Sequence, residues 1–130
     1  MFLNNLSEIE KKAFLTLAKE FILVDGVFSP EEEGLVRIMK EEMGIDEGFP
    51  EGEKTRKELF NLFASRKSRI SAIMEMEGLG YANMEYHIQE KAFIKEMADA
   101  FGLSQNELDS IDEWVIRQVA LLYEAHELLD

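Results

Sequence analysis

Apolar residues recur at steps of three and four along most of this chain, which is the spacing of an amphipathic helix. In residues 8–24, Phe14, Leu17 and Phe21 lie on one stripe, and apolar residues occupy much of the remaining surface. A helix that is apolar on most sides is usually buried in the middle of a domain. Further helices are expected at about residues 30–43, 53–64, 68–83, 86–101 and 105–128. No segment alternates apolar and polar residues over a sustained length, so the pattern predicts an all-α bundle of about six helices.

Short polar patterns mark where several of these helices begin and end. In a Ser-x-x-Glu pattern the serine side chain caps the backbone N–H three residues later, and the glutamate reaches back to the serine N–H. The chain has this pattern at three helix starts: Ser7 with Glu10, Ser29 with Glu32, and Ser104 with Glu107. Glycine readily adopts the left-handed conformation that ends many helices. Three of the expected helices are followed by such a glycine, at Gly26, Gly44 and Gly102.

The two halves of the chain carry a weak internal repeat. Superposing Gly44 on Gly102, an offset of 58 residues, places Glu32 on Glu90 and Met39 on Met97. Each copy ends in a helix followed by glycine and an aliphatic residue. The repeat predicts two related helix pairs with an approximate two-fold relationship.

One segment carries a family resemblance. Residues 25–32 resemble the Asp-Gly-x-x-Ser-x-x-Glu element of TerB-like (tellurite-resistance) proteins, and residues 90–111 resemble the second half of that domain. The resemblance covers most of the chain and is least specific around residues 45–69. It implies a single all-α domain of repeated helix pairs over residues 1–130. It also implies an association with tellurite-resistance and related stress systems, and with co-chaperones of the DnaJ class that bear a similar domain.

The same resemblance implies a metal site made of acidic residues. Matched to the motif, these residues are Asp25 and Glu32, with Glu90 in the second copy. Asn83 stands where a second aspartate would be expected, so the repeat does not supply a symmetric pair. A site of this kind would take a divalent ion such as Ca²⁺, Mg²⁺ or Mn²⁺.

Residues 25–32 have too few oxygen ligands to bind a calcium ion by themselves. Calcium takes about six to eight oxygens, and this turn offers too few. Ligands from elsewhere would have to complete the site, with Glu90 the favoured candidate and Asn83 or Glu85 as alternatives. The alternative is structural. Asp25 would then finish a helix and start a turn, and Glu32 would complete a capping box. The sequence leaves both readings open.

The charge balance narrows the range of partners. The chain has 27 acidic and 14 basic residues, a net charge of −13, and no cysteine. Such a surface repels phosphate backbones and anionic lipid, which disfavours nucleic acid and membrane surfaces as partners. Cations and basic protein surfaces are the natural attractants. Six basic residues fall between residues 54 and 69, whereas acidic residues crowd the last helix. These are either two solvated faces or a dipolar docking surface for self-association or for an acidic partner.

Methionine and aromatic residues raise a related alternative. Met74, Met76, Met84 and Met97 are expected to fill gaps in the core, although a methionine surface also suits partner helices. Trp114 and Tyr123, in the last helix, are expected to be packing residues.

No stretch approaches the ~20 apolar residues that span a bilayer, and residues 1–5 do not resemble a secretory signal, so a cytoplasmic protein is expected. The chain shows no Ser–His–acid spacing and no glycine-rich phosphate loop. The sequence therefore predicts a non-catalytic TerB-like module that binds a protein or itself in a tellurite or stress response. The alternative is a divalent-metal-binding protein.

Overall fold

The computed structural model describes residues 1–24, 29–81 and 88–130. These residues contain a short 3-10 helix, η1 (Leu3–Asn5), and no strand, so the all-α prediction is confirmed. The α-helices of the described residues are α1 (Glu8–Leu23), α2 (Pro30–Met43), α3 (Arg56–Phe60), α4 (Arg66–Gly80), α5 (Ile88–Ala100) and α6 (Gln105–Leu129). None of these helices is long and apolar enough to cross a membrane.

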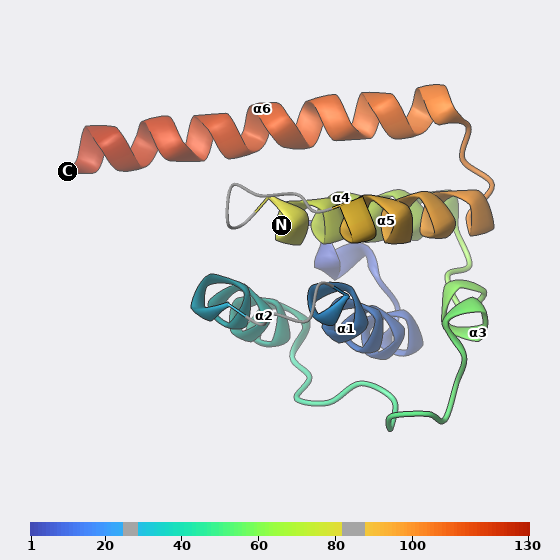
Figure 1. Ribbon diagram of the computed structural model, residues 1–130. Helices are drawn as coiled ribbons and strands as arrows, with labels where there is room; N and C mark the ends of the chain where they lie inside the picture. The colour runs from blue at the N-terminus through green and yellow to red at the C-terminus, as the bar shows by residue number, and fades with distance from the viewer. Residues whose placement is uncertain (25–28, 82–87) are drawn as a thin grey trace.

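The helices form three layers (Figure 1). The first layer contains α1 and α2, the second contains α4 and α5, and α6 lies on the far side of the second layer. Helix α4 packs against α1, α5 and α6, so it connects all three layers. Helix α3 closes one end of the bundle, where it contacts α1 and α5. The prediction that the first helix is buried is confirmed, because Phe14, Leu17 and Phe21 have no exposed surface.

The predicted caps define most of the helix ends. All three Ser-x-x-Glu patterns form complete capping boxes, at the starts of α1, α2 and α6. Gly44 and Gly102 have positive φ angles of 70° and 75° and follow α2 and α5, as expected from the sequence. Gly26 lies outside the described residues. Two further capping boxes, which the sequence interpretation did not use, begin α3 at Thr55 and α4 at Ser65.

The third helix is shorter than the predicted residues 53–64. Thr55 caps it, so the helix starts at Arg56, and it ends at Phe60. Beyond that point the N–H of Phe63 donates to the carbonyl of Phe60, a tighter turn than an α-helix makes. This turn places Phe63 in the core with its ring centroid 5.3 Å from that of Phe101. The burial of Phe63 therefore takes precedence over helix continuation.

The fourth helix starts earlier than predicted. It begins at Arg66 and not at Ser68, because Ser65 is the cap. Its predicted end at residue 83 and the predicted start of the fifth helix at residue 86 lie outside the described residues.

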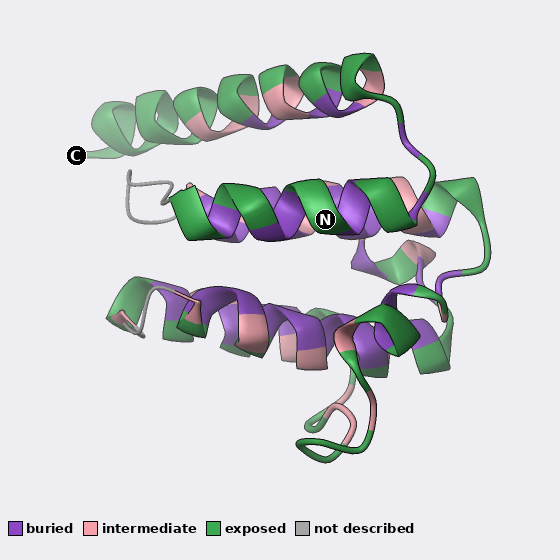
Figure 2. Ribbon diagram, turned by 45° about the vertical axis from the view of Figure 1, so that its right-hand side comes forward, coloured by how far each residue is buried: buried purple, intermediate pink, exposed green. Residues whose placement is uncertain are grey.

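Figure 2 shows how burial varies along the bundle. The helix surfaces that face one another are buried, and α6 is the most exposed long helix. Its buried residues are Leu108, Ile111 and Val115, all in its first half. The second half of α6 therefore lies outside the packed core.

Candidate functional site

Helix α6 is longer than the helix on which it packs. It has 25 residues and α4 has 15, so at ~1.5 Å per residue α6 is about 37 Å long and α4 about 22 Å. Every residue from 120 to 130 is exposed. We call residues 120–129 the α6 overhang, and it projects past the end of α4 (Figure 1).

The α6 overhang is apolar although it is exposed. Its large apolar side chains and their exposed fractions are Leu121 63%, Leu122 56%, Tyr123 39%, Leu128 87% and Leu129 82%. At helical spacing, Leu122 and Leu129 continue the stripe on which Ile111 and Val115 are buried. Contiguous exposed apolar surface of this kind marks interaction sites in proteins. The overhang therefore exposes an apolar stripe of the kind that is buried earlier in α6, and no described residue buries it.

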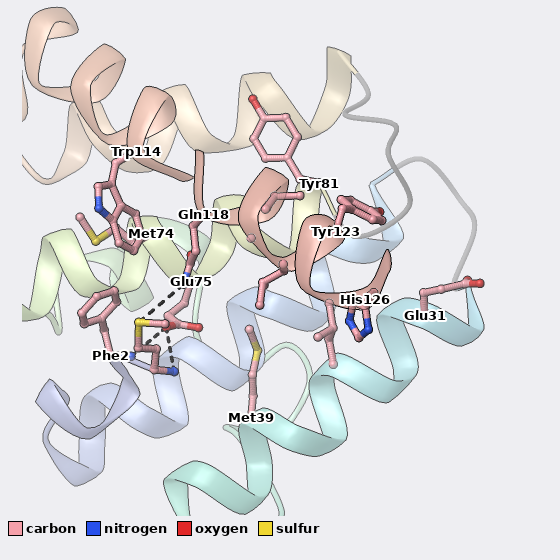
Figure 3. Close-up of a pocket in the computed structure, with 15 residues that line it drawn as sticks. Phe2, Glu31, Met39, Met74, Glu75, Tyr81, Trp114, Gln118, Tyr123 and His126 are labelled. Carbon is pink, nitrogen blue, oxygen red and sulfur yellow. Dashed lines mark hydrogen bonds and ion pairs between the residues drawn. The ribbon is translucent and has the colours of Figure 1, made fainter. Parts of the chain in front are cut away.

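A groove runs beside the overhang, between α6, α4, α2 and the residues before α1 (Figure 3). Its volume is about 460 Å³. The apolar side chains that line it include Leu35, Met39, Met74, Trp114, Val119 and Leu122. Methionine adapts its shape to irregular apolar partners, and aromatic residues supply large contact areas. The groove is thus lined by the residue types that protein-binding surfaces favour.

The charged side chains in this lining are acidic. Among the described residues that line the groove are Glu31 of α2 and Glu75 of α4, and none is lysine or arginine. Glu75 accepts a hydrogen bond of 2.9 Å from the backbone N–H of Phe2 and lies 3.2 Å from the terminal amine of Met1. Glu31 is exposed at the other end of the groove (Figure 3). The groove is therefore an apolar surface with carboxylates at its margin.

The predicted metal residues are placed only in part. Glu32 and Glu90 are 3% and 2% exposed, which is unusual for carboxylates. The Glu32 side chain accepts hydrogen bonds from the backbone N–H and the hydroxyl of Ser29, at 3.2 and 3.0 Å, so its predicted capping role is confirmed. Asp25 lies outside the described residues, as do Asn83 and Glu85. In the part of the chain that the structure describes, no group of three or more His, Cys, Asp or Glu residues is arranged to hold a metal. The Asp25, Glu32 and Glu90 site stays a prediction.

A second buried carboxylate cluster lies between α4 and α6, and the sequence interpretation missed it. Glu77 is 1% exposed, and neither of its carboxyl oxygens has a hydrogen-bond donor among the described residues. Burial raises the pKa of the Glu77 carboxyl to about 9, and the adjacent Asp112 carboxylate adds to the rise. A proton on Glu77 makes it a donor toward Asp112, whereas two ionised carboxylates have no proton to share. The signal in the sequence is that Glu77 follows Met76 directly and lies four residues after Ile73, on the same helix face as Ile73. Met76 and Ile73 are both fully buried.

Tyr81 completes this cluster. Its hydroxyl donates a hydrogen bond of 2.8 Å to Oδ1 of Asp112. Burial raises the pKa of the Tyr81 hydroxyl, and Asp112 contributes to the rise. The cluster lines a small polar pocket of about 270 Å³ together with Lys91 and Lys95 of α5. Tyr81 also lines the apolar groove, so it lies between the two sites.

Two of the basic residues in segment 54–69, Arg56 and Arg66, form ion pairs within the chain. Arg56 forms ion pairs with Glu20 and Glu96, at 3.2 and 2.9 Å, and its guanidinium group lies over the ring of Phe93. Arg66 pairs with Glu107 at the start of α6. These pairs tie together helices of the same bundle, which favours a structural reading for Arg56 and Arg66.

No family model, no curated protein and no solved structure matches this chain. The resemblance of residues 25–32 to TerB-like proteins stays an expectation from that element. The groove, the α6 overhang and the buried carboxylates are the features of the described residues that bear on function.

Proposed function

We propose that this protein is a non-catalytic interaction module that holds a helical segment of another protein in the groove beside the α6 overhang. The observation that carries the proposal is the exposed apolar surface of the overhang, above all Leu122, which is 56% exposed and lines the groove. Complete burial of one leucine side chain contributes about 1.5–3 kcal/mol. A partner that covers several overhang residues would gain enough to bind with useful affinity.

The shape of the site suits a helix. The groove is flanked by α2 on one side and α6 on the other, and a helix laid between them would pack against both. Amphipathic helices bind apolar grooves through side chains spaced at i, i+3 or i+4, and i+7. The overhang itself has this spacing at Leu122, Ala125 and Leu129. The occupant would thus continue the packing that α6 already makes with α4.

The resemblance of residues 25–32 supports a place for this module in a tellurite-resistance or related stress system. The repeat supports a further proposal, that α1 with α2 and α4 with α5 are related helix pairs. Helices α1 and α4 begin 58 residues apart, the offset found in the sequence. Glu32 and Glu90, which the offset superposes, are both buried.

A non-catalytic role agrees with where the perturbed carboxylate lies. A general acid needs to reach its substrate, and Glu77, whose raised pKa would suit acid–base chemistry, is only 1% exposed. We propose that the Glu77, Asp112 and Tyr81 cluster joins α4 to α6 and so fixes one wall of the groove.

Site-specific photo-crosslinking in the native cell tests the interaction proposal. A photoreactive residue in place of Leu122 should crosslink one defined protein, whereas the same residue in place of Ile116, which is outside the groove lining, should not. That protein, once purified, should bind the unmodified chain and bind the Leu122→Gln variant more weakly. Absence of a crosslink at position 122, or failure of the purified protein to bind, would contradict the proposal.

A second candidate function is divalent-metal binding through Asp25, Glu32 and Glu90. The observation behind it is that Glu32 and Glu90, which the 58-residue offset superposes, are both buried. The capping of Ser29 by Glu32 supports the structural alternative. A cation titration with variants at these positions separates the two.

A further inference from the structure

We infer that the occupant of the groove is a basic amphipathic helix, apolar on one face and carrying lysine or arginine on its flanks. This inference rests on the proposed interaction function and specifies the class of partner. It depends on the charges around the groove, the length of the overhang and the residue types of the lining.

Charge is the first argument. The described lining has two carboxylates, Glu31 and Glu75, and no lysine or arginine; its basic groups are His126 and the terminal amine of Met1. Glu75 already pairs with the terminal amine of Met1, so this margin of the groove accommodates a cation in the structure itself. Glu31, exposed at the opposite end, is placed to receive a second cation from a partner. A lysine or arginine at the Glu31 end of a bound helix would match this carboxylate, whereas the Met1 amine already neutralises Glu75.

The overall charge points the same way. A net charge of −13 attracts basic segments over a distance of about 8 Å at physiological ionic strength and speeds their association. A second copy of this chain brings the same acidic charge to the interface and is repelled. Anionic lipid is repelled for the same reason. A basic peptide segment is the occupant that both the apolar lining and the charge favour.

Length and lining define the segment further. The α6 overhang is ten residues, or about 15 Å, which is close to three helical turns. A partner helix of about 10–14 residues would cover it, with apolar anchors on successive turns. Met39 and Met74 line the groove from α2 and α4, and such flexible side chains accept anchors of different shape. The partner is therefore specified by its charge and amphipathic pattern more than by one particular anchor residue.

Fluorescence of Trp114 offers a direct test, because it is the single tryptophan of the chain and lines the groove. Three synthetic peptides of about 14 residues, long enough to cover the α6 overhang as a helix, serve as probes. The first carries leucine at helical spacing with lysine elsewhere, and the second has glutamate in place of every lysine. The third is a scrambled form of the lysine peptide. The lysine peptide should shift the Trp114 emission saturably and bind at least about tenfold more tightly than either other peptide.

Paired variants of the protein locate the effect. Leu122→Gln should weaken binding of the lysine peptide by about tenfold, and Ile116→Gln, on a face of α6 outside the lining, should leave it unchanged. Glu31→Lys should weaken the lysine peptide and strengthen the glutamate peptide. Glu33→Lys makes the same charge change on α2 outside the groove lining and should alter the two affinities much less.

The outcomes separate this inference from the function on which it rests. If the glutamate peptide binds as tightly as the lysine peptide and Leu122→Gln weakens both, the groove binds helices but the inferred charge of the partner is wrong. If the chain forms dimers that Leu122→Gln dissociates, the occupant is a second copy and the inference is overturned. If no peptide shifts Trp114 and the chain is monomeric, both the inference and the interaction function fail.

Discussion

The hydroxyl of Tyr81 donates a 2.8 Å hydrogen bond to Oδ1 of Asp112 and so joins the end of α4 to α6 beside the buried carboxyl group of Glu77. Tyr81 is the C-terminal cap residue of α4, and Asp112 lies one turn before Val115, the last fully buried residue of α6. The bond therefore lies near the point where α6 leaves the core. Because Tyr81 also lines the groove, the cluster that contains Glu77 borders the groove wall.

The first prediction concerns the pH dependence of stability. Burial raises the pKa of Glu77 to about 9 in the folded protein, against about 4.3 in an unfolded chain. Between these values the folded state binds one more proton, so the contribution of Glu77 to the free energy of unfolding falls as pH rises, by up to about 1.4 kcal/mol per pH unit. Glu77→Gln keeps the shape of the protonated acid and removes this dependence. The variant should be the more stable protein at pH 8, and its advantage should shrink toward pH 5.

Urea unfolding of both proteins across this pH range measures the difference. Glu113→Gln, an exposed position on α6, is the control for loss of one negative charge. Parallel stability curves for the Glu77 variant and the parent protein would show that Glu77 is ionised in the folded state.

The second prediction isolates the Tyr81 hydroxyl. Tyr81→Phe keeps the ring but removes the donor to Asp112, and loss of such a bond costs about 1–2 kcal/mol. Tyr123→Phe makes the same chemical change on the α6 overhang, where the side chain is 39% exposed, and should alter stability little. Denaturant unfolding at neutral pH compares the two. Equal effects of the two substitutions would mean that the Tyr81–Asp112 bond adds nothing to stability.

The third prediction concerns Glu10, which is 4% exposed and joins α1 to the start of α4. Its carboxylate accepts hydrogen bonds of 2.8 Å from the N–H groups of Ser7 and Ala64 and from the hydroxyl of Ser68. Burial acts to raise the pKa of Glu10, but these hydrogen bonds outweigh it, so the pKa is lowered. The resulting stabilisation is present above the unfolded pKa of about 4.3 and is lost as pH falls through the folded pKa.

Glu10→Gln should therefore destabilise the protein by about 1–3 kcal/mol at pH 7, because the amide cannot accept on both sides. The difference from the parent protein should fade as the pH drops below about 4. Glu8→Gln, at an exposed neighbouring position, is the control and should cost little. Thermal melts at a series of acidic pH values test this, and a difference that persists unchanged at low pH would contradict it.

The fourth prediction compares two glycines. A Cβ at Gly48 would lie 2.9 Å from the carbonyl oxygen of Lys12 and would overlap the hydroxyl of Thr16. That hydroxyl accepts a 2.8 Å hydrogen bond from the N–H of Phe49, so it is not free to move aside. Gly48→Ala should cost about 1–3 kcal/mol of stability, as overpacking does.

Gly34 is the matched control, because it lies inside α2 with open space around its Cα. Gly34→Ala should stabilise the protein by about 0.5–1 kcal/mol through helix propensity. Opposite signs for the two substitutions in a denaturant titration would support the close approach of the loop to α1. A neutral Gly48→Ala would show that the loop relaxes away from Thr16.

Features fixed by nearby residues could be predicted from the sequence, and features fixed by a neighbouring helix could not. The capping boxes of α1, α2 and α6 depend on residues three apart, so the pattern alone located them. The end of α3 depends on where Phe63 is buried, which is a property of the whole core. The buried state of Glu77 likewise depends on α6 lying across α4.

The groove is also a feature that neighbouring helices determine, so the sequence pattern alone did not predict it. Trp114 and Met74 pack against the core, as expected, and they also line the groove together with Tyr123, which is 39% exposed. Met76 and Met97, with no exposed surface, are core residues as expected, and Met84 lies outside the described residues. A periodic apolar stripe shows which face of α6 packs against other helices. Only the position of α4 shows where along α6 that packing ends. The overhang could therefore be recognised only in the folded chain.

The last prediction tests metal binding by Asp25, Glu32 and Glu90. Chelator-treated protein is melted with Ca²⁺, Mg²⁺, Mn²⁺ or Zn²⁺ in turn. An ion that binds only the folded state stabilises it by about 2.7 kcal/mol at a hundredfold excess over its dissociation constant. If the site forms, one ion should raise the melting temperature saturably, and Asp25→Asn with Glu32→Gln should abolish the rise.

Glu33→Gln with Asp46→Asn removes the same charge at exposed positions and should preserve the rise in melting temperature. Glutamine also serves in a capping box, so Glu32→Gln alone should cost little stability. A small rise shared by all four ions, and equal in both double variants, would reflect screening of an acidic surface and leave Glu32 with its capping role alone.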